Sequence, residues 1–258
     1  MPETAVPLSP NPLKAALKEG RRQIGLWTSM RSNVSAEIVA RAGFDWILLD
    51  TEHAPNETPD VLAQLQAMAV GTAEPVIRCA WNDAVLIKRI LDLGARSLLI
   101  PFVQNAEEAR RAVAATRYPP EGIRGVAVGT RATHWGLLPD YIRLANDQIC
   151  VIVQIETRAA VAEIEAIAAV EGVDALFIGP SDLAADMGFL GNPGHAEPQA
   201  VFKEAVGRIR GAGKAAGMLS GDPAAVQRYL EMGFSFVAVG SDTNILAQAA
   251  RRLALQFK

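Results

Sequence analysis

Short runs of apolar and β-branched residues alternate along the chain with longer segments in which apolar residues recur at helical spacing. Eight such runs begin at Gln23, Trp46, Pro75, Ser97, Cys150, Ala175, Lys214 and Phe236. Their nearly continuous apolar character is typical of parallel strands that are buried on both faces. Segments such as 83–93, 158–170 and 223–232 have the helical spacing. The pattern therefore predicts eight consecutive βα units.

Eight such units predict a (β/α)₈ or TIM barrel. The length of 258 residues matches the roughly 250 residues of one such barrel. A doubly wound sheet would not need eight consecutive units. We expect one domain over residues 1–258, which includes a short N-terminal arm of about residues 1–20. The prolines and small polar residues at its start favour a loose arm that packs on a neighbouring subunit.

Most of the predicted strands end in polar residues, and in this fold the C-terminal ends of the strands carry the chemistry. The clearest cases are Asp50, Glu52 and His53 after the second run, Arg78, Gln154 with Glu156, and Asp182. Two connections, 118–148 and 188–197, are longer than usual and are candidates for functional loops. We expect Thr130–Trp135 and Gly188–Glu197 to contact the variable part of a substrate.

Glu156 and Asp182 end consecutive predicted strands and could converge on one divalent cation. Mg²⁺ is usually held by one or two carboxylates with waters and ligand oxygens, and Mn²⁺ or Co²⁺ accepts the same donors. The alternative is a helix cap, since Ser181 and Asp182 precede a helical segment and Asp is a favoured N-cap residue. Two acids on adjacent strands favour the metal.

His53 and Arg78 are the other candidates for chemistry. His53 is close in sequence to Asp50 and Glu52, and a carboxylate near an imidazole increases its basicity and fixes its tautomer, which suits a general base. A passing ion pair in a loop is the alternative. Arg78 interrupts an apolar strand, where a charge is rarely buried without a partner. It would bind a carboxylate or oxyanion at the mouth, or form a salt bridge inside the barrel.

Composition excludes several classes of function. The formal charge of −3 shows no basic footprint for nucleic acid or an anionic membrane. The start of the chain lacks a basic segment followed by an apolar one, and no apolar stretch reaches about 18 residues. Cys79 and Cys150 lie inside apolar runs and predict two buried free thiols. We expect a soluble, cytoplasmic enzyme.

Several stretches together resemble the HpcH/HpaI family of class II pyruvate aldolases. They are GFDWILLDTEHAP, PVIRCAWNDAVLIKRILDLGARSLLIPFVQNAEEA, YPPEGIRGVAVGTRATHW, VIVQIETRAAV and LFIGPSDLAADMG. The resemblance runs from about residue 25 to residue 242, in order and at natural spacing. It implies a TIM-barrel enzyme that reversibly cleaves a 4-hydroxy-2-oxo acid to pyruvate and an aldehyde, through a pyruvate enolate.

The resemblance also implies roles for individual residues. Glu156 and Asp182 match the metal ligands, Arg78 the residue beside the ketone oxygen, and His53 with Asp50 the catalytic base. The pyruvate-binding positions are Gln154, Ser181, Gly179 and Pro180. Asp92 matches an acid that strengthens the histidine as a base, and it can do so only from a neighbouring subunit. A shared site fits a homo-oligomer, by resemblance a hexamer built as a trimer of dimers.

Some alternatives stay open. Family members take hydroxyheptanedioate, deoxyglucarate or deoxyrhamnonate skeletons, and His134 stands at a rim position where relatives carry other polar residues. A CoA-thioester lyase of the citrate lyase β-subunit type would need a basic surface near the mouth. A Schiff-base aldolase would need a lysine within a strand, whereas Lys88 and Lys203 fall in helical segments. A non-catalytic barrel that binds 2-oxo acids is the third rival.

Overall fold

The computed structural model describes residues 8–138 and 140–258 and shows a closed barrel of eight parallel strands. Each strand pairs with the next along the chain, and β8 closes the barrel on β1. The strands are β1 (Gln23–Thr28), β2 (Trp46–Asp50), β3 (Glu74–Arg78), β4 (Ser97–Ile100), β5 (Cys150–Ile155), β6 (Val173–Ile178), β7 (Ala215–Leu219) and β8 (Phe236–Ser241). The predicted (β/α)₈ barrel is therefore confirmed.

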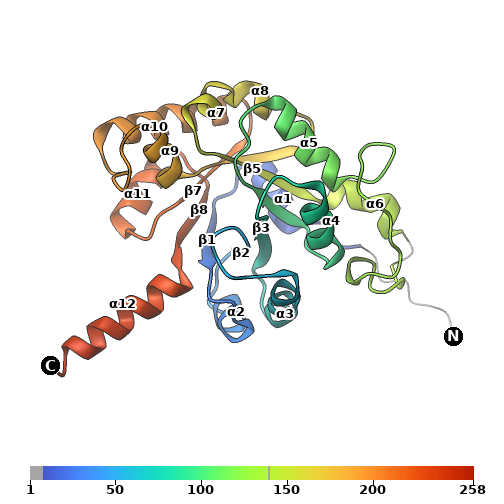
Figure 1. The fold of residues 1–258 in the computed structure, drawn as a ribbon, viewed down its shortest axis with the longest axis horizontal. Helices are drawn as coiled ribbons and strands as arrows, with labels where there is room; N and C mark the ends of the chain where they lie inside the picture. Colours follow the sequence, from blue (N-terminus) through green and yellow to red (C-terminus); the bar gives the residue numbers. More distant parts are fainter. Residues whose placement is uncertain (1–7, 139) are drawn as a thin grey trace.

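Helices connect and follow the strands, and most of them surround the barrel and bury its outer face (Figure 1). They are α2 (Asn33–Ala40), α3 (Thr58–Met68), α4 (Ala84–Asp92), α5 (Ala106–Thr116), α6 (Tyr141–Gln148), α7 (Arg158–Ala162), α8 (Ile164–Ala168), α9 (Pro180–Asp186), α10 (Ala196–Gly211), α11 (Pro223–Met232) and α12 (Asp242–Leu255), with the 3-10 helix η1 (Arg131–Thr133). The helix predicted over 158–170 is two short helices, because the backbone of Glu163 leaves the helical region between them.

The inside of the barrel is filled by aromatic side chains. Trp46 stacks on Phe236 with ring centroids 4.0 Å apart, and Trp27 lies 5.7 Å from Phe177. Gly25 on β1 makes room for this layer, since a Cβ there would lie 2.1 Å from the Trp46 ring. The packed layer is the floor under any ligand at the C-terminal ends of the strands.

The helix α1 (Pro12–Lys18) closes the opposite end of the barrel. Leu13 and Leu17 are buried in the same cluster as the aromatic layer. Asn11 caps α1 by accepting a hydrogen bond from the Lys14 amide. The prediction of a loose arm was wrong for this part, because the spacing of the leucines gives an apolar helix face that the barrel buries. Residues 1–7 of the predicted arm lie outside the described residues.

The last helix, α12, contacts β1 and β8 but extends away from the barrel (Figure 1). Its apolar residues Leu246 and Leu253 are exposed. On α2, which follows β1 in the barrel, Val34 and Ile38 are also exposed, by 60% and 66%. Two apolar helix surfaces of the described chain are thus left open to solvent.

Two sequence expectations concern the chain as a whole. Cys79 and Cys150 are buried and free, as predicted. Among the helices of the described residues, none combines the length and hydropathy required to cross a bilayer.

Candidate active site

A cavity of about 500 Å³ opens at the C-terminal ends of the strands. Seven predicted site residues line it: His53, Arg78, Gln154, Gly179, Pro180, Ser181 and Asp182. They come from the ends of β2, β3, β5 and β6 and the loops that follow, which the barrel topology brings to one rim. Asp50 and Glu156 are buried just below, bonded to members of this set.

Arg78 is held between two carboxylates under the cavity. Its Nε and Nη2 donate to Oδ1 and Oδ2 of Asp50 at 2.8 and 2.6 Å, and its Nη1 lies 2.8 Å from Oε2 of Glu52. Its guanidinium also lies 5.0 Å from the Trp27 ring centroid. The salt bridge considered from the sequence is therefore present. A guanidinium has five N–H groups, and these three contacts leave other N–H groups to face the cavity. Arg78 is therefore held in place and can still bind an oxyanion.

The two partners of Arg78 differ in charge behaviour. Burial raises the pKa of Asp50, but the hydrogen bonds and charge of Arg78 outweigh it, so the pKa lies below its ordinary value. Burial also raises the pKa of Glu52, and there the charges of Arg78 and His53 only partly offset the effect. The Trp27 indole N–H donates to Asp50 as well, at 3.2 Å. Asp50 is thus a fixed anion that orients the arginine.

Glu156 is held on both of its carboxylate oxygens. The Gln154 side-chain amide donates to Oε1, and the backbone N–H of Phe102 donates to Oε2 at 3.0 Å. Phe102 has a left-handed backbone, with φ of 52°, which is uncommon outside glycine and is found where surrounding structure enforces it. Gly179 lies so close that a Cβ there would be 2.4 Å from Oε1 of Glu156. The carboxylate is therefore clamped by neighbouring strand ends.

The electrostatics around Glu156 favour a cation. Burial, with the nearby negative charges of Glu52 and Asp182, raises the pKa of Glu156 to about 7. Asp182 lies in the first turn of α9 and lines the cavity, while Gly179 takes the N-cap position. The cap predicted as the alternative is therefore not the role of Asp182. The carboxylates of Glu52, Glu156 and Asp182 repel one another, and one arginine does not balance them. A divalent ion would balance this charge and restore Glu156 to its ionised form.

One further atom supports this reading. The Oε1 atom of Gln154 is buried and accepts no hydrogen bond from the described residues, although buried polar groups are normally satisfied. No three His, Cys, Asp or Glu side chains of residues 8–138 and 140–258 are grouped to hold a metal. Two carboxylates with substrate and water oxygens are the donor set that Mg²⁺ usually has in proteins. The residues fit an open, oxygen-rich cation site.

His53 lies in the loop after β2, exposed at the cavity wall. Its backbone N–H is 3.4 Å from Oδ1 of Asp50, which helps to fix the loop. Of the two carboxylates expected near His53, Asp50 is engaged by Arg78 and Trp27, whereas Glu52 is close enough for the charge of His53 to act on it. The exposed imidazole is free to meet a substrate hydroxyl.

Asp92 is not at this cavity. It ends α4, at the N-terminal end of the barrel, where its carboxylate receives a hydrogen bond of 3.0 Å from Nη2 of Arg124. The Arg124 side chain is fully buried, with its guanidinium over the Tyr118 ring at 4.4 Å. Within one chain Asp92 therefore cannot touch His53, as the sequence predicted.

The two long loops lie at opposite ends of the barrel. Pro193 of the 188–197 segment lines the mouth cavity, in agreement with the prediction. The 130–135 segment does not: His134 and Trp135 border a different cavity beside the start of β4. That prediction was wrong for the chain's own barrel, because the connection after α5 leads into the start of β5 and so lies at the N-terminal ends of the strands.

Glu52 was expected at this rim, but its pairing with Arg78 was not, and neither were the roles of Trp27, Phe102 and Tyr229. Glu52 pairs with Arg78, the Phe102 amide holds Glu156, and Tyr229 lines the mouth. The i,i+2 spacing of Asp50 and Glu52 could have identified the first. The left-handed Phe102 and the distant Tyr229 carry no comparable sequence signal.

The cavity also bears on two rival mechanisms. No lysine lines it among the described residues. Lys14 and Lys214 instead donate to the carbonyls of Ile149 and Val173 at the start of β5 and β6. Arg78 is the only arginine of the described residues that lines the mouth, which offers little to the phosphates of CoA. The geometry thus favours neither a Schiff-base aldolase nor a CoA-thioester lyase.

Comparison with known proteins agrees with this site. The family model HpcH/HpaI aldolase/citrate lyase matches residues 23–249. A 4-hydroxy-2-oxo-heptane-1,7-dioate aldolase from Salmonella paratyphi A is 57% identical over 248 residues, which cover 96% of this chain and 94% of the relative. The aldolase of the same name from Salmonella typhimurium is equally similar.

Solved structures show the same likeness. An HpcH/HpaI aldolase/citrate lyase family protein from Burkholderia cenocepacia superposes with a TM-score of 0.93 at 41% identity, covering 96% of this chain and 99% of the other. The chain therefore belongs to the HpcH/HpaI aldolase/citrate lyase family and is a carbon–carbon lyase of the aldolase type.

Proposed function

We propose that this enzyme cleaves 4-hydroxy-2-oxoheptane-1,7-dioate to pyruvate and 4-oxobutanoate, and joins them in reverse. The convergence of Arg78, Gln154 and two carboxylates on one cavity carries the proposal, because a 2-oxo acid needs both a cation and an oxyanion partner. The choice of skeleton is supported by relatives of that name at 57% identity.

In this proposal Arg78 contacts the 2-oxo oxygen. Asp50 and Glu52 hold the guanidinium in place, so its free N–H groups face the position where negative charge develops. Preorganised donors of this kind are worth about 3–4 kcal/mol each where one has been removed. Gln154 and the 179–181 turn, including Ser181, contact the carboxylate of the pyruvate unit.

Glu156 and Asp182 hold a divalent metal ion, Mg²⁺ first, with Mn²⁺ or Co²⁺ as substitutes. When bound, the ion would supply Lewis acidity to the 2-oxo oxygen. The Phe102 amide and Gln154 keep the Glu156 carboxylate oriented before the ion arrives.

His53 accepts the proton of the 4-hydroxyl, directly or through a water. The C3–C4 bond then breaks, its electron pair becomes the enolate of pyruvate, and the 4-carbon leaves as the aldehyde. A proton delivered to C3 completes pyruvate, so atoms and charge balance. A general base of this kind contributes about 10²- to 10⁴-fold to the rate.

The enzyme works as a homo-oligomer, which we propose to be a hexamer built as a trimer of dimers. The open apolar faces of α12 and α2 support self-association, since surfaces of this kind in a soluble protein mark contact sites. Asp92 of one subunit would then reach the His53 loop of the next and strengthen its imidazole as a base. A cytoplasmic location remains part of the proposal.

The test is pyruvate release from 4-hydroxy-2-oxoheptanedioate, with and without EDTA. EDTA should abolish release, and added Mg²⁺, Mn²⁺ or Co²⁺ should restore it. A panel of aldehydes offered with pyruvate then ranks 4-oxobutanoate against its neutral analogue butanal and against sugar-derived aldehydes. Borohydride trapping of pyruvate on a lysine would overturn the mechanism. Failure to turn over any aldehyde would leave a non-catalytic binding barrel.

A further inference from the structure

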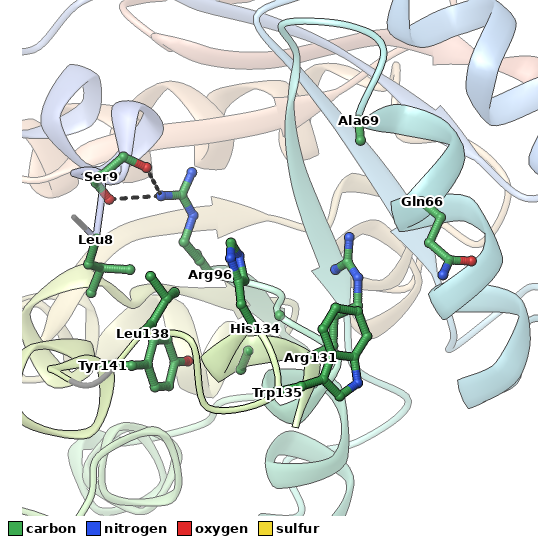
Figure 2. Close-up of a pocket in the computed structure, with 12 residues that line it drawn as sticks. Leu8, Ser9, Gln66, Ala69, Arg96, Arg131, His134, Trp135, Leu138 and Tyr141 are labelled. Carbon is green, nitrogen blue, oxygen red and sulfur yellow. Dashed lines mark hydrogen bonds between the residues drawn. The ribbon is translucent and has the colours of Figure 1, made fainter. Parts of the chain in front are cut away.

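A second cavity, of about 600 Å³, lies at the end of the barrel opposite the mouth. Its position follows from the topology: Gly94 and Arg96 directly precede β4, and Gln66 and Ala69 lie at the end of α3. Figure 2 shows Arg131, His134 and Trp135 projecting from one segment across from α3. The aldolase site and this cavity are therefore separated by the packed aromatic layer of the barrel.

The cavity carries an arginine without a counter-ion. Nη1 of Arg131 donates to the Leu93 carbonyl at 2.6 Å, but no carboxylate of the described residues pairs with it, and none lines the cavity. Arg96 differs, because its Nη2 is 3.0 Å from Glu74. Partial burial lowers the pKa of Arg131, which reflects a cation removed from water without an anion beside it. An anion would complete this half-buried site.

Much of the remaining wall is apolar, with Ser9, Gln66 and His134 as polar members, and the segment that carries Trp135 is held in place. Trp135 is 68% exposed, yet its segment is fixed through Thr133, whose hydroxyl donates to Val128 and accepts from the Gly136 amide. The left-handed backbone of His134 and Trp135 is set by these bonds. Leu138 and Tyr141 add buried apolar surface. An exposed indole on a fixed backbone segment, beside a cation, suits a flat ligand more than a hydrated ion.

We propose that this cavity binds a small organic carboxylate with a flat apolar body. Arg131 takes the carboxylate, because its planar fork matches two carboxylate oxygens. Trp135 and Leu138 contact the body of the ligand. The ligand is not the substrate of the same barrel, since the cavity opens at the end opposite that barrel's own mouth.

Calorimetric titration of the assembled enzyme with 2-naphthoate tests the proposal, with the isosteric neutral 2-naphthamide and inorganic phosphate as comparisons. Naphthoate should bind at least tenfold more tightly than either. Arg131→Gln should weaken the binding of naphthoate at least tenfold. Trp135→Ala should also weaken naphthoate binding, and it should leave the fold intact because the indole is exposed. Arg143→Gln is the matched control, since that exposed arginine pairs with Asp140 on α6 outside the cavity and should bind as the parent protein does.

The opposite results overturn the proposal. Equal binding of naphthoate and naphthamide removes the role of Arg131, and tighter binding of phosphate removes the role of the apolar wall. Competition by saturating pyruvate and Mg²⁺ would place the naphthoate in the mouth. No saturable binding at all would mean that the cavity is covered in the assembled enzyme, as by a second copy of the chain.

Discussion

The guanidinium of Arg78 and the carboxylate of Asp50 form a two-point ion pair beneath the mouth, at 2.8 and 2.6 Å. Both side chains are almost fully buried. The pair joins the ends of the neighbouring strands β2 and β3, whose register places the two residues opposite each other. Orientation of the arginine is therefore part of the barrel itself and needs no ligand.

We expect Asp50→Ala to destabilise the fold by roughly 3–5 kcal/mol, because it leaves a buried guanidinium short of one partner. Urea unfolding measures the change. The control is Asp140→Ala, which breaks an exposed pair with Arg143 and should cost less than about 1 kcal/mol. Equal midpoints for the two variants would show that the buried pair is not a stabilising element.

The raised pKa of Glu156 predicts a pH dependence of the metal-free protein. Its folded-state pKa of about 7 exceeds the ordinary value of 4.5, so the folded state binds more protons between these two values. The stability due to this group is present below about pH 4.5 and is lost as pH rises through about 7, on the order of 3 kcal/mol. Urea unfolding in EDTA at pH 5 and pH 8 measures the loss.

Glu156→Gln should reduce this decline, since the amide does not titrate, and Mg²⁺ should offset it in the parent protein. The control variant Glu204→Gln, on the exposed face of α10, should keep the full decline. A parent protein whose stability does not fall between these pH values would mean that Glu156 is ionised without metal.

Gly179→Ala should weaken Mn²⁺ binding at least tenfold, because the new Cβ would lie 2.4 Å from Oε1 of Glu156 and displace the carboxylate. Electron paramagnetic resonance of free Mn²⁺ measures the affinity without reference to turnover. Gly207→Ala serves as the control: it lies in α10 with open space around it, so it should leave metal binding unchanged and stabilise by up to about 1 kcal/mol. Unchanged Mn²⁺ affinity in Gly179→Ala would contradict the assigned ligand.

Much of this site could be predicted because it follows the barrel's topology. Acids at the ends of β5 and β6 must meet at one rim, so Glu156 and Asp182 could be paired from their spacing alone. The hydrophobic pattern alone does not show at which end of the barrel a connection lies. That depends on whether the connection follows a strand or a helix, and the 130–135 segment follows a helix. The Phe102 amide could not be predicted, since its contact depends on a backbone angle rather than on a residue type.

Ile38→Asp should dissociate the assembly, because it places a charge on the open apolar face of α2. Light scattering after size exclusion should give a smaller mass than the parent protein. Gln227→Asp, an exposed position on α11, should leave the mass unchanged. A parent protein with the mass of a monomer would contradict the oligomer proposal. An Ile38→Asp variant with the mass of the parent assembly would show that α2 is not part of the contact.

The position of the helix α1 affects the order in which the products are released. Because the buried leucines of α1 close the far end of the barrel, substrate enters and both products leave through the mouth alone. In the proposed reaction the pyruvate unit sits deeper, against Arg78, and the aldehyde nearer the entrance. The aldehyde should therefore be released before pyruvate. In product-inhibition kinetics, pyruvate should then inhibit competitively against the hydroxy-oxo acid, and the aldehyde noncompetitively.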